Sequence, residues 1–507
     1  MPALDKAAVV GVVGAGTMGA GIAQVAAQAG HAVLLTDSVA GAVERGLGDI
    51  AAGLDRLVEK ARMARDQRDA VLGRVRAVAG LEDLAPARLV VEAVTEDLSV
   101  KRALFAALES IVAADVVLAS NTSSLSITAL AAGLTHPGRV IGMHFFNPPP
   151  LMPLVEVISG RASAAVAVET VFATARAWGK QPVHVRSTPA FIVNRVARPY
   201  YGEAFRLLDE GWADIATIDT LLREAGGFRM GPFELIDLIG LDVNLAVTRS
   251  VHAAFFGDPR YAPSLTQQDY VDAGWLGRKS GRGFYDYAPG AAKPKAAEAE
   301  LGPRPDAVLI EGDLGPAEAL VGLWRAAGIP LTRDEAGGRG PAIICHDAVL
   351  MPTDGRPASL RAAHPHENLV LFDLALDYAT APRLALAPAE GATAAARAAA
   401  AGLFQAAGKR VSEIADAPGM VVMRTVAMLV NEAAEVVQRG VAEPSAVDTA
   451  MRLGVNYPLG PLAWADSLGP GRMLEVLDHL ADFYREDRYR AAPLLRLNAR
   501  GGRRFHQ

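Results

Sequence analysis

Two residues of this chain have the side-chain types that the removal of a proton from an alcohol requires. His144 and Glu156 both lie in the run HFFNPPPLMPLVEV. An imidazole is a good general base near neutral pH, and a carboxylate on its far ring nitrogen would fix the tautomer and stabilise the imidazolium. Oxidation of a secondary alcohol needs such a base while hydride leaves for an acceptor. Each residue alone also has a structural interpretation, His144 as an interior histidine and Glu156 as an edge-strand acid.

The segment around these two residues predicts how they would meet. It reads as a strand that ends near His144, a Pro-rich loop, and a second strand that contains Glu156. If the strands are antiparallel neighbours, the two side chains lie together across the loop. Spacing alone does not establish this pairing, so it stands as an expectation.

A glycine-rich turn near the N-terminus indicates the hydride acceptor. Residues 8–37 read as an apolar strand, the turn Gly14-x-Gly16-x-x-Gly19, an amphipathic helix and a second strand that ends in Asp37. Gly14 permits a tight turn, Gly16 lets the backbone approach a pyrophosphate, and Gly19 lets the helix pack on the strands. Asp37 stands where a ribose 2′-hydroxyl is held, which favours NAD because a 2′-phosphate would be repelled.

Two other interpretations of residues 8–37 exist, a glycine-rich surface loop in an ordinary α/β protein and a membrane helix. Gln24, Gln28 and the glycine interruptions argue against a membrane helix. The combination of strand, turn, helix, strand and terminal acid argues against a simple loop.

Composition sets the broad class. The chain has 507 residues, of which 51% are hydrophobic and 21% charged, as in a soluble globular protein of several domains. Its net charge of −6 gives no electrostatic case for binding nucleic acid or an anionic membrane. The single Cys345 excludes a disulfide framework and a cysteine metal cluster, and we expect no metal. No secretory signal is visible, so we expect a cytoplasmic protein.

The hydrophobic patterns predict an α/β plus all-α protein. Within the first part, residues 41–80 have helical spacing and no strand pattern, while residues 89–94 and 116–124 read as strands followed by small polar residues. The predicted parts are a Rossmann-type NAD-binding domain (1–186), a helical domain (187–287), an Ala/Pro linker (288–304), a reduced Rossmann-like unit without a glycine fingerprint (305–410) and a second helical domain (411–507).

The second helical domain repeats the first. Residues 188–219 align with 417–448 without a gap, and GPFELIDLIG has its counterpart in GPLAWADSLG. In this alignment Asn194 corresponds to Met423, while Arg195 and Arg424 are both arginine. The polar residue is present only in the half that has the nucleotide turn. This contrast predicts a chemical role for Asn194 and a scaffolding role for the second copy.

The motifs SNTSSL (120–125), HFFNPPPLMPLVEV (144–157) and FIVNR (191–195), behind GAGTMGAGIA, resemble the L-3-hydroxyacyl-CoA dehydrogenase family. The resemblance covers residues 1–290 and the second helical domain as a repeat, whereas residues 291–410 match poorly. It implies NAD-dependent, reversible oxidation of an L-3-hydroxyacyl-CoA to the 3-oxoacyl-CoA. It also implies an active site between the nucleotide domain and the first helical domain.

The resemblance also assigns roles to particular residues. His144 resembles the family's catalytic base and Glu156 its orienting carboxylate. Ser123 resembles the catalytic serine that hydrogen-bonds the substrate's 3-hydroxyl region beside the cofactor, and Asn194 resembles the asparagine that completes the active site from the helical domain. Lys60 resembles a residue that contacts coenzyme A, although Gly53 departs from the serine found there in the family. The implied NAD contacts are Gly14, Gly16, Thr17, Met18, Gly19, Asp37, Glu96, Lys101, Asn121, Asn147 and Lys279.

Some of these residues have structural alternatives. Ser123 could cap the following helix, and Lys60 and Lys101 could be solvated surface charges. For the whole chain the competitors are a β-hydroxyacid dehydrogenase acting on a free acid and a non-enzymatic NAD-binding protein. The former would use a lysine in the helical domain, and residues 187–275 contain none.

The repeated architecture resembles bacterial family members that act in the β-oxidation of short-chain acids and in the breakdown of aromatic acids such as phenylacetate. The implied substrate is therefore 3-hydroxybutyryl-CoA or the dicarboxylic 3-hydroxyadipyl-CoA, and the sequence does not decide between them. We expect either a homodimer or intramolecular pairing of the two helical domains, because both repeats present apolar helix faces.

Overall fold

The computed structural model of the chain describes residues 2–335, 340–364 and 367–506. These residues form two units by their contacts. The first comprises the chain as far as Arg195 together with Arg439–Val455, and the second comprises Val196–Gln438 and Asn456–Gln507. Among the described helices, none combines the length and apolarity needed to cross a membrane.

The first unit is built on an eight-stranded sheet with the strand order β3-β2-β1-β4-β5-β6-β7-β8. Strands β1 to β6 are parallel, β7 is antiparallel to β6, and β8 is parallel to β7. The central strands are apolar and buried along nearly their whole length, as expected where helices cover both faces. The strands are β1 (Val9–Val13), β2 (Val33–Thr36), β3 (Val75–Ala77), β4 (Ala87–Glu92), β5 (Val117–Ser120), β6 (Val140–Phe145), β7 (Leu154–Ser159) and β8 (Gln181–Arg186).

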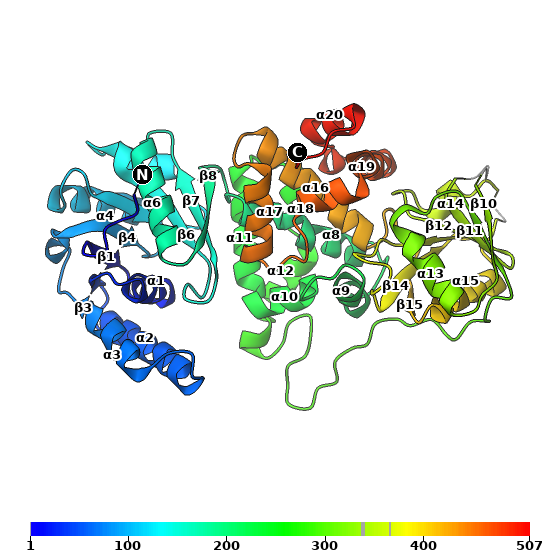
Figure 1. The fold of residues 1–507 in the computed structure, drawn as a ribbon, viewed down its shortest axis with the longest axis horizontal. Helices are drawn as coiled ribbons and strands as arrows, with labels where there is room; N and C mark the ends of the chain where they lie inside the picture. The colour runs from blue at the N-terminus through cyan, green and yellow to red at the C-terminus, as the bar shows by residue number, and fades with distance from the viewer. Residues whose placement is uncertain (1, 336–339, 365–366, 507) are drawn as a thin grey trace. The chain divides into compact units, whose positions relative to one another are not determined.

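Helices connect these strands, and one segment comes from the second helical repeat. Figure 1 shows α2 and α3 as a helical pair that extends away from the sheet. Helix α17 packs on β7 and β8. The helices are α1 (Thr17–Gln28), α2 (Ala42–Glu59), α3 (Arg65–Arg74), α4 (Leu98–Ile111), α5 (Ile127–Ala131), α6 (Ala165–Ala177), α7 (Val193–Val196), at which the first unit ends, and α17 (Pro444–Gly454).

One prediction for this unit was wrong. Residues 41–80 contain a strand as well as helices, because β3 pairs with β2 at the edge of the sheet. Only Val75 of this three-residue strand is buried, while Arg76 and Ala77 are exposed. Such a short edge strand has no apolar alternation from which a sequence pattern could reveal it.

The two helical repeats pack on each other within the second unit. Helix α8 of the first repeat lies beside α16 of the second (Figure 1), and the Glu203 carboxylate accepts a hydrogen bond from Arg424 Nε at 2.7 Å. The predicted intramolecular pairing is therefore present. The helices of the repeats in this unit are α8 (Arg198–Asp209), α9 (Ile215–Glu224), α10 (Pro232–Ile239), α11 (Leu241–Ala254), α12 (Leu265–Asp272), α16 (Val422–Gln438), α18 (Pro461–Leu468), α19 (Pro470–Tyr484) and α20 (Pro493–Gly501).

The same unit contains a second, mixed sheet of seven strands in the order β10-β9-β11-β12-β13-β14-β15. The predicted α/β plus all-α fold class is thereby confirmed. The strands are β9 (Val308–Glu311), β10 (Leu331–Asp334), β11 (Ala342–Cys345), β12 (Ala348–Pro352), β13 (Leu369–Phe372), β14 (Arg383–Pro388) and β15 (Arg410–Glu413), with helices α13 (Glu318–Ala326), α14 (Ala358–Arg361) and α15 (Ala394–Ala406).

The last four strands of the second sheet repeat the last four of the first. β12 and β13 are parallel, β14 is antiparallel to β13, and β15 is parallel to β14, as in β5 to β8. The beginning differs, because β11 is antiparallel to both of its neighbours. After β9 the turn contains Asp313 and Pro316, which add a negative charge and remove one N–H where a phosphate would need positive, donor-rich backbone.

Candidate active site

The three glycines of the turn after β1 have different surroundings. A Cβ on Gly14, whose φ is +100°, would lie 2.6 Å from the Ala93 carbonyl oxygen, and a Cβ on Gly19 would lie 1.7 Å from the Gly14 carbonyl oxygen. A Cβ on Gly16 would meet no atom within 4 Å. Gly14 therefore closes the turn, Gly19 allows α1 to approach it, and Gly16 borders open space.

Asp37 follows β2 and lies against the same turn. Its Oδ2 accepts a hydrogen bond from the Ala15 N–H at 2.7 Å, and its Oδ1 accepts one from the Val39 N–H at 2.8 Å. Thr17 is exposed and Met18 partly exposed at the start of α1. A dinucleotide would meet backbone N–H groups at this helix start and a carboxylate at the neighbouring strand end.

The structure brings His144 and Glu156 together. They are directly opposed in the antiparallel pair β6 and β7, so their side chains leave the same face of the sheet. His144 Nδ1 lies 2.7 Å from Glu156 Oε2, and the residues are 6% and 1% exposed. The expected pairing across the Pro-rich loop is confirmed. The rings of Phe146 and Phe191 flank the imidazole, with centroids 4.6 and 5.9 Å from its own.

Asn194 lies in α7, and the start of this helix is bound to the same carboxylate. Glu156 Oε1 accepts hydrogen bonds from the N–H groups of Ile192 and Val193, both at 3.1 Å. Asn194 is the next residue of the chain and is partly buried. Glu156 is therefore bonded both to the imidazole and to the backbone that leads into Asn194.

The Glu96 carboxylate accepts hydrogen bonds from the polar residues that follow β5. It accepts hydrogen bonds from the Thr122 hydroxyl at 2.6 Å and from the Ser123 and Ser124 N–H groups at 3.0 and 3.1 Å. Burial alone would raise the pKa of Glu96, but the Thr122 hydrogen bond and the charge of Lys101 outweigh it, so the pKa is lowered. The carboxylate is therefore ionised at neutral pH.

Ser123 lies in this group with its hydroxyl oxygen 3.4 Å from Glu96. The alternative in which Ser123 caps the next helix is wrong. The cap of α5 is Ser126, whose hydroxyl accepts the Ala129 N–H at 3.2 Å. The Ser123 hydroxyl is thus available for a role other than capping.

Lys101 is enclosed in the protein, so the interpretation as a solvated surface charge is wrong. Its side chain is 1% exposed and forms an ion pair with Glu92, with Glu96 Oε2 3.4 Å from Nζ. Glu92 is fully buried and also accepts the Ser120 hydroxyl at 2.7 Å. Sequence reasoning missed Glu92, because a carboxylate at the end of an apolar strand forms no motif.

Asn121 follows the end of β5, and Asn147 lies just beyond the end of β6. Asn121 Oδ1 accepts a hydrogen bond from the Phe145 N–H at 2.8 Å, which fixes the end of β6. Asn147 is exposed at the start of the Pro-rich loop. Both residues therefore belong to the edge of the sheet that contains the His144 imidazole.

Lys180 is a second residue that sequence reasoning missed. Its Nζ donates to the carbonyl oxygens of Pro149 and Met152 at 2.6 and 3.0 Å, and so ties down the Pro-rich loop between His144 and Glu156. Burial lowers the pKa of Lys180. A lone lysine next to a strand carries no sequence signal for this role, since its partners are backbone carbonyls.

Two predicted residues lie outside this cluster. Lys60 follows α2 and is exposed. Lys279 belongs to the second unit, where its Nζ lies 2.5 and 2.7 Å from the Asp242 carboxylate oxygens. Burial would raise the pKa of Asp242, but the hydrogen bond from Lys279 lowers it overall.

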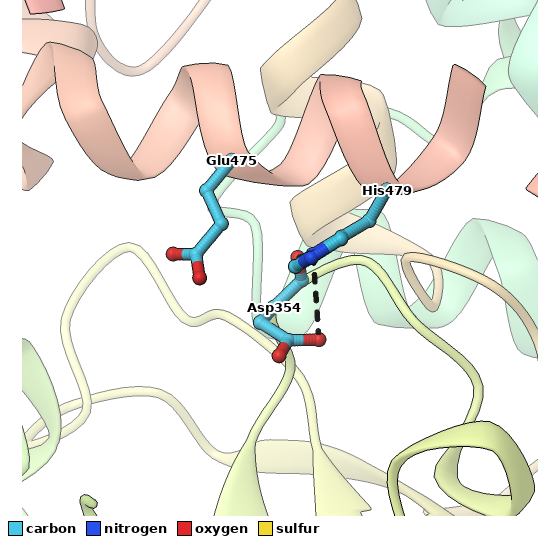
Figure 2. Close-up of side chains that lie close together, drawn as sticks. All are labelled: Asp354, Glu475 and His479. Atoms are coloured by element: carbon cyan, nitrogen blue, oxygen red, sulfur yellow. Dashed lines mark hydrogen bonds and ion pairs between the residues drawn. The ribbon is translucent and has the colours of Figure 1, made fainter. Parts of the chain in front are cut away.

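One trio of ligand-type side chains in the described parts of the chain is close enough to hold a metal ion. Figure 2 shows Glu475 and His479 on α19, and Asp354 on the loop after β12. Asp354 is already paired with Arg356 at 2.5 Å and with Arg361 at 3.5 Å, and His479 Nδ1 lies 2.8 Å from the Asp354 carbonyl oxygen. With two guanidinium groups on its central carboxylate, the trio is an ion-pair cluster between the second sheet and α19.

Models of known protein families match most of the chain. The NAD-binding domain of 3-hydroxyacyl-CoA dehydrogenase matches residues 9–188, and its C-terminal domain matches 191–287 and again 419–504. The reduced Rossmann-fold domain of 3-hydroxybutyryl-CoA dehydrogenase matches residues 350–418. The helical repeat seen in the sequence therefore corresponds to two copies of one family domain.

Individual relatives agree with these matches. The 3-hydroxyadipyl-CoA dehydrogenase of Escherichia coli (strain K12) is 46% identical over 492 residues, 97% of each chain. A probable 3-hydroxybutyryl-CoA dehydrogenase of Deinococcus radiodurans is 44% identical over 277 residues, 55% of this chain and 99% of that one. A crystal structure described as 3-hydroxybutyryl-CoA dehydrogenase from Escherichia coli K12 is similar with a TM-score of 0.89 and 43% identity over 98% of each chain.

These similarities span both halves of the chain, and the nucleotide turn and the acid-bound histidine lie within the matched segments. A β-hydroxyacid dehydrogenase and a non-enzymatic NAD-binding protein are therefore set aside. The chain belongs to the 3-hydroxyacyl-CoA dehydrogenase family and is an NAD-dependent oxidoreductase that converts 3-hydroxyacyl-CoA to 3-oxoacyl-CoA.

Proposed function

We propose that His144 is the general base of this oxidation and that Glu156 orients it. The supporting observation is the 2.7 Å contact between His144 Nδ1 and Glu156 Oε2. With Nδ1 donating to the carboxylate, Nε2 has its lone pair free to accept the proton of the substrate's 3-hydroxyl group. The carboxylate then stabilises the imidazolium that this transfer creates.

The cofactor suits this chemistry, since the space at Gly16 and the carboxylate of Asp37 match a pyrophosphate and a ribose. When bound, NAD supplies the acceptor for the hydride that leaves C3 of the L-3-hydroxyacyl group. The rings of Phe146 and Phe191 lie beside the His144 imidazole, so the imidazole accepts the substrate's proton in apolar surroundings. The proposed NAD-binding residues are Gly14, Gly16, Thr17, Met18, Gly19, Asp37, Glu96, Lys101, Asn121, Asn147 and Lys279.

Ser123 and Asn194 are proposed to bind the substrate's reacting end. Glu96 accepts the N–H of Ser123, and Glu156 accepts the N–H groups of the two residues before Asn194, so a carboxylate fixes the backbone at each residue. Lys60 is proposed to contact a phosphate of coenzyme A, for which its exposed ammonium is suited.

The proposed substrate is a short-chain or dicarboxylic acyl-CoA, in the L configuration, and the proposed location is the cytoplasm. A relative that matches 97% of this chain is named 3-hydroxyadipyl-CoA dehydrogenase, while a similar crystal structure is described as 3-hydroxybutyryl-CoA dehydrogenase. Turnover of the C4, the C6-dicarboxylic and the C10 to C16 substrates should be compared side by side. We expect kcat/KM to be highest for one of the first two, and a maximum at C10 or longer would refute the proposal.

A further inference from the structure

Glu156 divides its two oxygens between two tasks. Oε2 meets His144 Nδ1 at 2.7 Å, whereas Oε1 accepts the N–H groups of Ile192 and Val193, each at 3.1 Å. The side chain is 1% exposed, so both sets of contacts are made away from water. A buried carboxylate is costly unless hydrogen bonds satisfy its oxygens, and here only one of the three contacts is with the histidine.

The backbone that Oε1 binds follows a strained turn. Ala190 has φ +61° and Phe191 has φ +52°, so two consecutive residues with side chains adopt the left-handed conformation. Residues with a Cβ disfavour this conformation, and it persists only where the surroundings hold it. The two N–H groups donated to Glu156 come immediately after these residues. The carboxylate is thus placed to hold the turn.

The second helical repeat has the same turn on a different carboxylate. Under the gap-free alignment Ala190 and Phe191 correspond to Gly419 and Met420, whose φ angles are +72° and +54°. The N–H groups that follow, from Val421, Val422 and Met423, donate to Asp373 at 2.9, 2.7 and 3.0 Å. Each copy therefore begins its helix on a buried acid.

The strand register shows which residue of the first sheet occupies the position equivalent to Asp373. In the first sheet His144 is opposite Glu156, which is opposite Val183 of β8. In the second sheet the Asp373 N–H donates to the Ala385 carbonyl oxygen, and Ala385 is opposite Ser412 of β15.

Extended upstream without a gap, the alignment of the two repeats pairs Ser412 with Val183. Asp373 therefore occupies the strand position of His144, and Ala385 occupies that of Glu156. The second copy lacks both members of the histidine–acid pair but retains a carboxylate under its helix. Holding the turn is thus a task separate from orienting a histidine.

We infer that Glu156 is a positioning residue for two groups: it orients His144 through Oε2, and through Oε1 it holds the strained turn that sets the position of Asn194. The inference rests on the proposed roles of His144 and Asn194. It predicts that removing Glu156 lowers kcat/KM in two separable ways. One part of the decrease comes from the misplaced base, and the other comes from the lost contribution of Asn194.

A double-mutant cycle tests the coupling. In Glu156→Gln the amide oxygen can accept the Ile192 and Val193 N–H groups while its NH2 faces His144, so the turn is retained and the base is lost. Glu156→Ala removes both. Asn194→Ala should lower kcat/KM by the same factor in the wild type and in Glu156→Gln, and by almost nothing in Glu156→Ala. An equal factor in all three backgrounds would overturn the inference.

A rescue experiment covers the case in which Glu156→Ala folds poorly. Ala190→Gly introduces the residue type that the second copy has at Gly419, and glycine adopts a positive φ without strain. Added to Glu156→Ala, it should raise Tm and restore soluble yield. It should do neither to a comparable extent in the wild type. A Tm increase of the same size in both backgrounds, or no increase in Glu156→Ala, would show that the carboxylate does not hold the turn.

Asp373→Asn is the matched control, because it alters the same turn where no histidine is present. It should lower Tm but leave kcat/KM, and the factor caused by Asn194→Ala, unchanged. A failure of the proposed base is distinguishable from a failure of this inference. The former appears as retained turnover in His144→Gln, and the latter as identical Asn194→Ala factors in every Glu156 background.

Discussion

His144 and Glu156 form a buried, hydrogen-bonded pair. The imidazole has one nitrogen on the carboxylate and two phenylalanine rings beside it, and the other nitrogen is the one that we propose takes the substrate's proton. Glu156 is not an edge-strand acid, since β7 lies between β6 and β8 and the residue is 1% exposed. Ser123 and Asn194, each fixed through a neighbouring carboxylate, complete this residue-level arrangement.

His144→Gln should lower kcat by about 10²- to 10⁴-fold, the usual contribution of a general base. Binding of NADH should stay near the wild-type affinity, because His144 lies in β6 and not in the glycine turn after β1. Steady-state kinetics and a fluorescence titration of NADH measure the two quantities. Turnover close to wild type would mean that another group removes the proton.

At the level of elements, the unit β1–turn–α1 shows how one motif uses three glycines for three purposes. Gly19 is needed for packing inside the protein, because a methyl group there would overlap the backbone of the turn. Gly16 faces open space instead, so its lack of a side chain matters only to what binds there. The two positions therefore separate folding from cofactor binding.

Gly16→Ala should leave Tm within about 2 °C of the wild type, since a change far below 1 kcal/mol moves Tm little. It should weaken the binding of NADH by at least about tenfold, or about 1.4 kcal/mol, because the methyl group fills the space of the pyrophosphate. Gly19→Ala is the contrasting variant and should lower both Tm and folded yield. Calorimetry and NADH titration compare them, and a loss of stability in Gly16→Ala with unchanged affinity would contradict the assignment.

At the scale of the whole molecule, a buried ion-pair cluster joins the two copies of the helical domain. Within the second unit, Glu203 from the first repeat is fully buried and bonded to Arg424 and Arg488 from the second, at 2.7 and 2.9 Å. Burial alone would raise the pKa of Glu203, but the charges of Arg488 and Arg424 lower it to about 2. One carboxylate between two guanidinium groups thus fastens the repeats together.

This pairing predicts acid lability. A carboxyl group with a lowered pKa in the folded state stabilises the protein above its ordinary pKa and loses that contribution as the pH falls. The stability due to Glu203 should therefore be lost between about pH 4.5 and 2. Glu203→Gln should destabilise the protein at neutral pH by about 3–5 kcal/mol, because two arginines stay buried without a counter-charge.

Urea midpoints from pH 7 down to the acid range, measured on the wild type and on Glu203→Gln, test this prediction. The variant should have the lower midpoint at neutral pH and the shallower decline on acidification. Parallel curves would mean that Glu203 titrates alike in the folded and unfolded chains.

Met423→Ala tests whether the second copy takes part in catalysis. Met423 is fully buried, so the substitution should cost about 2–5 kcal/mol of stability. The kcat per folded molecule should not change, because Met423 lies in α16 at the position that corresponds to Asn194, in the copy that has no glycine-rich nucleotide turn. Active-site titration of the folded fraction followed by single-turnover kinetics distinguishes the two effects. A large fall in the single-turnover rate would give the second copy a catalytic role.

The sequence alone determined whatever depends on local pattern. Strand, turn and helix around Gly14, the strands on either side of the Pro-rich loop, and the helical repeat all follow from hydrophobic spacing and glycine position. The pairing of His144 with Glu156 was predicted because a short loop between strands makes them neighbours. The edge strand β3 was missed, since a strand with one buried residue shows no hydrophobic alternation.

The tertiary structure decided everything that depends on partners distant in sequence. Three contacts join segments that share no sequence motif. Lys101 pairs with Glu92, Lys180 donates to a carbonyl oxygen of the Pro-rich loop, and Glu156 accepts the N–H of Ile192. A buried charge is stabilised only by the donors around it, and these are set by the packing of strands and helices. For that reason the residues of the site could be listed from sequence, while the means by which they are held could not.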